Sequence, residues 1–249
     1  MPFIGNAPAR VPLTSADITD GIITSAKIVD GTIVNADINA SSAIAVSKIA
    51  ATGTSNQVLR MNTGATALEF ATVSSDFVLL ATTTASNVTT LDINGYFTSS
   101  YDVYKLFIYN LYAGSSTNFN FRVATTGSYT VQTGNDYYGS HVYARKDSGS
   151  ATLEHAGDWG GSTMVCGLGG SATSSAVTNI EITIFNPLST SVKKKFNVHS
   201  NAIDGDITVS RSLIGGEYWN STTAVTGLRF ISSAGNNFTG TFKLYGIKN

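Results

Sequence analysis

Residues 177–185 read VTNIEITIF, and this pattern points to the fold class of the chain. Three isoleucines, Ile180, Ile182 and Ile184, alternate with polar residues. A period of two places successive side chains on opposite faces of a β-strand. The same alternation occurs in FNFRV at residues 119–123 and in FKLYGI at residues 242–247. We therefore expect strands that each turn one face toward a core.

The pattern extends outward over residues 76–249. Candidate strands cover residues 77–81, 88–93, 103–112, 119–125, 137–145, 177–185, 192–198, 206–210, 227–232 and 239–247. Clusters of Gly, Asn, Asp and Ser separate them, as turns require. No long segment has the period of an amphipathic helix. The sequence predicts an all-β head built as an antiparallel β-sandwich of jelly-roll type.

A five-residue repeat precedes the head. The isoleucines recur at a spacing of five, and an Ala or Gly lies two positions before each of them. They are Ile18, Ile23, Ile28, Ile33 and Ile38. Because neither a helix nor a strand has this period, we expect a turn every five residues, as in a pentapeptide-repeat β-solenoid. So few units bury little by themselves, which predicts an oligomerisation stalk; a flexible polar linker is the alternative.

These features divide the chain into four segments. Residues 1–12 contain Pro2, Pro8 and Pro12 and are expected to form an extended arm. Residues 13–50 are the repeat stalk. Residues 51–75 are rich in small polar residues around two apolar islands and are expected to be a connector that contains a hairpin. Residues 76–249 are the head.

The composition excludes several classes of partner. The chain has 249 residues, of which only 12% are charged, with 15 Lys and Arg against 16 Asp and Glu. We therefore expect neither nucleic-acid binding nor binding to a membrane through a basic surface. Cys166 is the only cysteine, and MPFIGNAPARVP at the N-terminus lacks the pattern of a signal peptide. The sequence predicts synthesis in a reducing cytoplasm and no membrane insertion.

The sequence lacks the usual catalytic and metal-binding patterns, which favours a protein that is not an enzyme and has no cofactor or metal. Glu154, His155 and Asp158 lack the spacing of a zinc helix and are interpreted as a surface loop. His141 and His199 fall within or beside strands, where cross-strand hydrogen bonding is the expected role. Cys166 lies in an apolar context typical of a packed thiol. The glycines at 167 and 169, which lack a surrounding βαβ unit, are interpreted as a loop.

Aromatic residues among small polar ones suggest a surface that contacts a receptor. They lie in the stretches 136–143, 158–161 and 217–220, which are interpreted largely as loops. Rings provide contact area at a small entropic cost, and neighbouring amides and hydroxyls supply hydrogen bonds. Packing in the core or between copies is the alternative. The candidate receptor-facing residues are Tyr137, Tyr138, Trp159, Tyr218 and Trp219.

The basic run at Lys193, Lys194 and Lys195 has two interpretations. It could be a solvated strand edge that charge protects from pairing with other edges. It could instead contact anionic glycans.

Several segments along the chain carry a resemblance to a known family. PFIGNAPAR, the repeat with the following GTSNQVLRMNTGATALEFATV, and the head segments YDVYKLFIYNL, NIEITIFNP and GLRFISSAGNNFTGTFKLYGIKN resemble bacteriophage tail-fibre proteins, particularly those of marine podovirus-like phages. The resemblance implies a virion structural protein, assembled as a homotrimer and located in the tail. It also implies that the arm binds other virion tail proteins through Pro2, Phe3, Ile4, Gly5 and Asn6.

The head would then mediate attachment to the host cell through a surface glycan or an outer-membrane protein. Two alternatives remain open. One is a capsid or tail decoration protein with no receptor role, which the shortness of the repeat favours. The other is a tailspike-like protein that binds or depolymerises polysaccharide.

Overall fold

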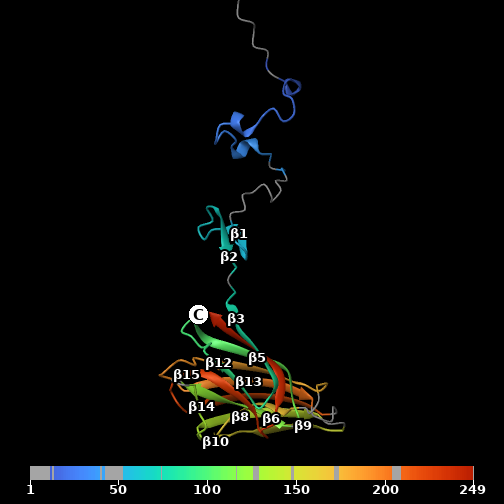
Figure 1. Ribbon diagram of the computed structural model, residues 1–249, viewed down its shortest axis with the longest axis vertical. Coiled ribbons are helices and arrows are strands. Elements are labelled where there is room, and N and C mark those ends of the chain that lie inside the picture. The colour runs from blue at the N-terminus through green and yellow to red at the C-terminus, as the bar shows by residue number, and fades with distance from the viewer. Residues whose placement is uncertain are drawn as a thin grey trace, which may run out of the picture. The chain divides into compact units, whose positions relative to one another are not determined.

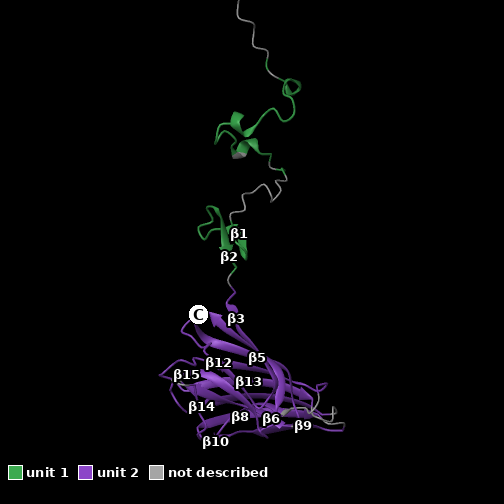
Figure 2. Ribbon diagram, in the orientation of Figure 1, with its two compact units in different colours: residues 1–73 green, residues 74–249 purple. Residues whose placement is uncertain are grey.

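The computed structural model describes residues 12, 14–39, 41–42, 53–73, 75–115, 117–125, 129–146, 149–170, 174–203 and 209–248. The chain divides into two compact units, Met1–Val73 and Ser74–Asn249 (Figure 2). The helices of the described residues are single short turns, none of which is long enough to cross a membrane.

The repeat in the first unit consists of successive turns. Three 3-10 turns, η1 (Ser15–Asp17), η2 (Ser25–Lys27) and η3 (Asn35–Asp37), alternate with tight turns at Gly21 and Gly31. These glycines have φ angles of +77° and +80°, a conformation that side chains with a Cβ rarely adopt. A backbone N–H closes each turn by donating to the carbonyl three residues earlier, over 2.8–3.1 Å. The donors are Asp17, Ile22, Lys27, Thr32, Asp37 and Ser42, so a turn recurs every five residues.

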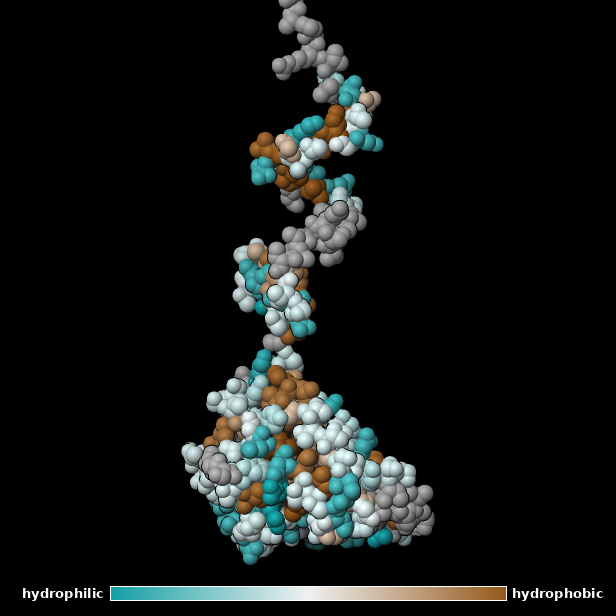
Figure 3. Space-filling model, in the orientation of Figure 1, coloured by the Kyte–Doolittle hydropathy of each residue, from teal (hydrophilic) through white to brown (hydrophobic). Residues whose placement is uncertain are grey.

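The isoleucines of the repeat are not covered by their own chain. Ile18, Ile23, Ile28, Ile33 and Ile38 are between 38% and 54% exposed. Figure 3 shows hydrophobic side chains at the surface of this segment. The turns therefore order the backbone without building a core.

The hairpin expected in the connector is present. Strands β1 (Gln57–Met61) and β2 (Leu68–Thr72) pair antiparallel. The Asn62 side-chain oxygen accepts hydrogen bonds from the backbone N–H of Thr66, at 2.9 Å, and of Ala67, at 3.4 Å, which closes the turn between them.

The second unit contains two antiparallel sheets (Figure 1). The larger has nine strands in the order β10-β8-β14-β13-β12-β5-β16-β3, with β9 also paired to β8. The smaller has five, in the order β11-β6-β15-β4, with β7 paired to β6. The bounds are β3 (Phe77–Val88), β4 (Thr90–Asn94), β5 (Tyr101–Ala113), β6 (Thr117–Thr125), β7 (Thr130–Val131), β8 (Tyr137–Lys146), β9 (Ala151–Ala156), β10 (Trp159–Gly161), β11 (Met164–Gly170), β12 (Thr178–Phe185), β13 (Lys194–Ile203), β14 (Ser210–Trp219), β15 (Val225–Ser232) and β16 (Phe238–Lys248).

Eight of these strands pair in a nested order, first with last. β3 pairs with β16, β4 with β15, β5 with β12 and β6 with β11. The remaining strands β8, β9, β10, β13 and β14 all extend the larger sheet beyond β12, and β7 extends the smaller one. The predicted all-β class with antiparallel sheets is confirmed, and the arrangement is consistent with a β-sandwich.

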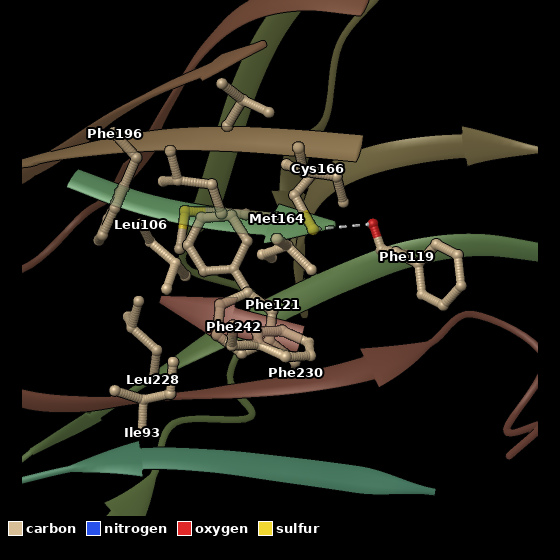
Figure 4. Close-up of a cluster of buried hydrophobic side chains, with 14 of the residues drawn as sticks. Ile93, Leu106, Phe119, Phe121, Met164, Cys166, Phe196, Leu228, Phe230 and Phe242 are labelled. Atoms are coloured by element: carbon tan, nitrogen blue, oxygen red, sulfur yellow. Dashed lines mark hydrogen bonds between the residues drawn. The ribbon is translucent and has the colours of Figure 1, made fainter. Parts of the chain in front are cut away.

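Aromatic side chains from both sheets meet in the core. Phe121 on β6 lies with its ring centroid 5.2 Å from that of Phe196 on β13 and 5.9 Å from that of Phe230 on β15. Phe230 in turn lies 5.1 Å from Phe242 on β16 (Figure 4). Because β13 and β16 belong to one sheet and β6 and β15 to the other, these contacts join the inner faces of the two sheets.

Four segments correct the strand predictions. Residues 151–156, 159–161, 164–170 and 210–219 are strands β9, β10, β11 and β14. No strand is predicted from the sequence for the first three, and the interpretation of the glycines at 167 and 169 as a loop is wrong. The predicted strand at 206–210 lies largely outside the described residues, and the strand found there begins at Ser210.

Candidate binding surface

Three of the predicted aromatic residues form a cluster on the outer face of the larger sheet. Tyr138 on β8 and Tyr218 on β14 are directly opposite each other in the register, and their rings stack at 5.1 Å with 12° between the planes. Trp159 on β10 pairs with Tyr138, and the two rings meet edge to face at 5.4 Å. Trp159 is nevertheless 91% exposed. The tyrosine pair therefore supports a tryptophan whose surface remains open to solvent.

A shallow depression of about 380 Å³ lies beside this cluster. Its other lining residues include Ser140, Asp158 and Gly216. The backbone of Asp158 is fixed by two hydrogen bonds with Gly139, in which each N–H donates to the other's carbonyl at 3.0 and 3.1 Å. Hydroxyl, carboxylate and aromatic groups thus surround one hollow.

Tyr137 and Trp219 do not contribute to this surface, which corrects their interpretation as receptor-facing. They are 0% and 4% exposed. The Tyr137 hydroxyl donates to the Gln132 carbonyl at 2.8 Å and accepts the Val123 N–H at 3.1 Å, and burial raises its pKa to about 12. The reason is alternation along a strand, because neighbours of the outward Tyr138 and Tyr218 must point inward.

An unusual polar pair lies beneath the cluster, on the inner face of the same strands. His141 Nδ1 lies 3.5 Å from Glu217 Oε1, and the two side chains are 4% and 1% exposed. Burial raises the pKa of Glu217, and the contact with His141 opposes that rise. Gly139 makes room for the carboxylate, because a Cβ at that position would lie 2.0 Å from Glu217 Oε2.

The basic run is not a strand edge. Lys194 begins β13, which lies between β12 and β14 in the sheet, and it is 1% exposed. Its ammonium donates to the carbonyls of Ser189, Val192 and Thr222 at 2.5, 2.8 and 3.2 Å, and burial lowers its pKa. The Lys194 ammonium therefore joins the loop between β12 and β13 to the loop between β14 and β15. Lys193 and Lys195 are exposed.

The remaining candidate groups are one buried thiol and two exposed side chains on β9. Cys166 is fully buried, its thiol donates to the Phe119 carbonyl at 3.3 Å (Figure 4), and burial raises its pKa. Glu154 and His155 lie on strand β9 and are exposed, so their interpretation as a loop is wrong. Within the described part of the chain, no group of three His, Cys, Asp or Glu side chains could hold a metal ion.

A set of outward polar residues on β12 and β13 was not singled out from the sequence. Asn179, Asn197 and Asn201 are exposed on the same face as the aromatic cluster, beside His199. Glu181 joins them and pairs with Lys105 of β5. The alternation that predicts the core also identifies these outward positions, but it does not indicate which of them share a depression.

The proposed attachment residues Pro2, Phe3, Ile4, Gly5 and Asn6 lie outside the described residues. No protein-family model, curated protein or solved structure matches the chain.

Proposed function

We propose that this chain is a tail-fibre-like virion adhesin that assembles from three copies and attaches a bacteriophage to its host. The observation that carries the proposal is the exposed isoleucine series of the repeat, with each side chain between 38% and 54% exposed in a single chain. Apolar side chains at a fixed spacing are covered when several copies wind or stack together. The repeat then acts as a stalk, and the preceding arm joins the tail.

The aromatic cluster of the head supports the adhesive role. Trp159, Tyr138 and Tyr218 are exposed or half-buried on a strand framework, with hydroxyl and carboxylate groups beside them. Three heads on one stalk raise the effective concentration of each contact, so weak individual contacts give firm attachment. The head binds its receptor without chemical turnover, and no cofactor takes part.

The strand order supports a jelly-roll architecture for the head. In a jelly roll, a chain paired first with last is rolled so that its strands alternate between two sheets. The nested pairs β3 with β16, β4 with β15, β5 with β12 and β6 with β11 follow that order. Strands β8, β9, β10, β13 and β14 are then insertions that widen one sheet.

Two measurements test the proposal. The first is labelling of virions with an antibody to the head, and we expect label at the tail only. Label spread over the capsid would instead identify a decoration protein. The second is competition, in which the purified full chain should reduce adsorption of virions to cells, whereas the Trp159→Ala variant should compete less well. Release of sugars from host polysaccharide by the purified chain would contradict a purely adhesive role.

A further inference from the structure

Three depressions on the outer face of the larger sheet join into one groove. The first, of about 270 Å³, lies over β5, β12 and β13, and the second, of about 440 Å³, lies over β12, β13 and β14. They share Glu181 and His199. The second and the depression beside Trp159 share Gly216. The groove therefore crosses the strands from Tyr109 on β5 to the aromatic cluster at β8 and β10.

We propose that this groove binds an internal segment of a linear, uncharged glycan chain. The inference rests on the proposed adhesive function and goes beyond it by naming the chemical class and the length of the ligand. Its length follows from the sheet, because neighbouring strands lie about 4.8 Å apart. From β5 across β12, β13, β14 and β8 to β10, which carries Trp159, the groove crosses five strand spacings, or about 24 Å, which matches about five pyranose rings in an extended chain.

Amide side chains supply the hydrogen bonds that sugar hydroxyls require. Asn179 and Asn201 face each other across β12 and β13, and the Asn179 amide donates to Oδ1 of Asn201 at 3.4 Å. Asn197 lies farther along β13 and lines the second depression. All three are exposed. Because each amide both donates and accepts, it can bind a hydroxyl in either role.

Charges along the middle of the groove are balanced. The Glu181 carboxylate, which lines the first two depressions, accepts a hydrogen bond from the Lys105 ammonium. The pair leaves little net charge to attract an ionic ligand. Asp158 adds one carboxylate at the aromatic end, where it can accept hydroxyl protons and would repel an anionic sugar. Lys195, opposite Tyr218 in the register, and Lys243, whose ammonium lies 5.8 Å from the centre of the Tyr109 ring, lie beside the two ends. Carboxylates and ammoniums are thus interspersed along the groove, which has no strongly charged region and favours a neutral chain over a polyanion.

The aromatic end provides the strongest single contact. Trp159 has almost its whole surface free, and the edge-to-face contact with Tyr138 limits its orientation. A ring held in place covers the apolar face of a sugar at little cost in side-chain entropy. The far end combines the amides of Asn179 and Asn201 with the side chains of Phe107 and Tyr109, which line the same depression. A ligand must reach both ends to gain both contributions.

The test measures binding of the full chain to a panel of neutral linear oligosaccharides of one to eight sugars, from the maltose, cellobiose and chitobiose series and from mannan. We expect affinity to rise with length up to about five sugars and then to level off. Trp159→Ala should weaken binding of every length by about tenfold, since one lost aromatic contact is of that size. Asn201→Ala should weaken binding of pentamers and longer chains but leave disaccharides unchanged.

Asn94→Ala is the matched control, because Asn94 is an exposed asparagine on β4 of the other sheet. It should bind as the wild type does. Affinity that does not depend on length, tighter binding of sulfated or uronic-acid chains, or no binding to any neutral chain would overturn the inference. So would a drop in oligomeric mass in Asn201→Ala, because the groove would then be an interface between copies. After any of these results, if the purified full chain blocks virion adsorption, the adhesive function stands and only the glycan inference fails. If the purified full chain does not block adsorption, the adhesive function fails as well.

Discussion

Replacing an isoleucine of the repeat should weaken assembly of the protein without unfolding the head. Ile28 is 38% exposed and Ile23 is 53% exposed in a single chain. Burying a whole Ile side chain contributes about 1.5–3 kcal/mol, so covering the exposed part contributes about 1 kcal/mol per residue. A trimer contains three copies of each, and Ile28→Ser should therefore cost about 3 kcal/mol per trimer, or about a hundredfold in the association constant.

Sedimentation velocity over a range of concentrations measures this effect. The sedimentation of the wild-type protein should give three times the 26.1 kDa mass of one chain. The double variant Ile23→Ser, Ile28→Ser should dissociate at concentrations where the wild type remains a trimer. Leu153→Ser is the control, because Leu153 is 76% exposed on β9 of the head and lies outside the repeat. Equal masses for the wild type and both variants, or a wild type that stays a single chain at high concentration, would refute the reasoning.

Three predictions concern the head. Phe121→Ala should lower the free energy of unfolding in urea by about 3–5 kcal/mol, since its ring is fully buried between the two sheets. Gly215→Ala should cost about 1–3 kcal/mol, because its Cβ would lie 2.5 Å from that of His141, whereas Gly216→Ala meets nothing within 4 Å and should unfold as the wild type does. Because burial raises the pKa of Glu217 in the folded state, its contribution to stability should fall as pH rises above its unfolded pKa; Glu217→Gln should remove that dependence in thermal unfolding between pH 4 and 7.

The strands that alternate strictly were predictable because burial imposes their pattern. β12 and β16 alternate buried and partly or fully exposed residues over their length, and the sequence shows the same period. β14 was missed at residues 211–219 because Gly215 and Gly216 look like a turn. Gly215 is required for a packing reason instead, since His141 of the neighbouring strand occupies the space of its side chain. Such a requirement depends on a pairing between residues far apart in the chain, which local patterns do not contain.

The candidate site was predictable in composition but not in detail. A strand is predicted at residues 137–145, but that prediction alone does not say which of its faces is buried, and no strand is predicted at 217–220; Tyr137, Tyr138, Tyr218 and Trp219 are therefore all surface candidates from the sequence. Once β8 and β14 are known, their register assigns Tyr138 and Tyr218 to the surface and Tyr137 and Trp219 to the core. The burial of Lys194 could not be predicted for the same reason. Three consecutive lysines suggest a solvent-exposed run, but the middle one, Lys194, begins strand β13 and its side chain points inward.

The position of the aromatic cluster within the topology bears on how the head acquires a binding surface. None of its three residues lies on the eight strands that pair first with last, because Tyr138, Trp159 and Tyr218 belong to β8, β10 and β14. The shared hydrophobic cluster, by contrast, draws much of its aromatic content from β6, β15 and β16. Changes in the added strands can therefore alter the surface while the central pairs keep the fold, which separates specificity from stability in one sheet. The groove begins on the central strands β5 and β12, which carry Tyr109 and Asn179, and continues on the added strands, which carry Asn201 and the aromatic cluster, so changes in the added strands can alter most of its length.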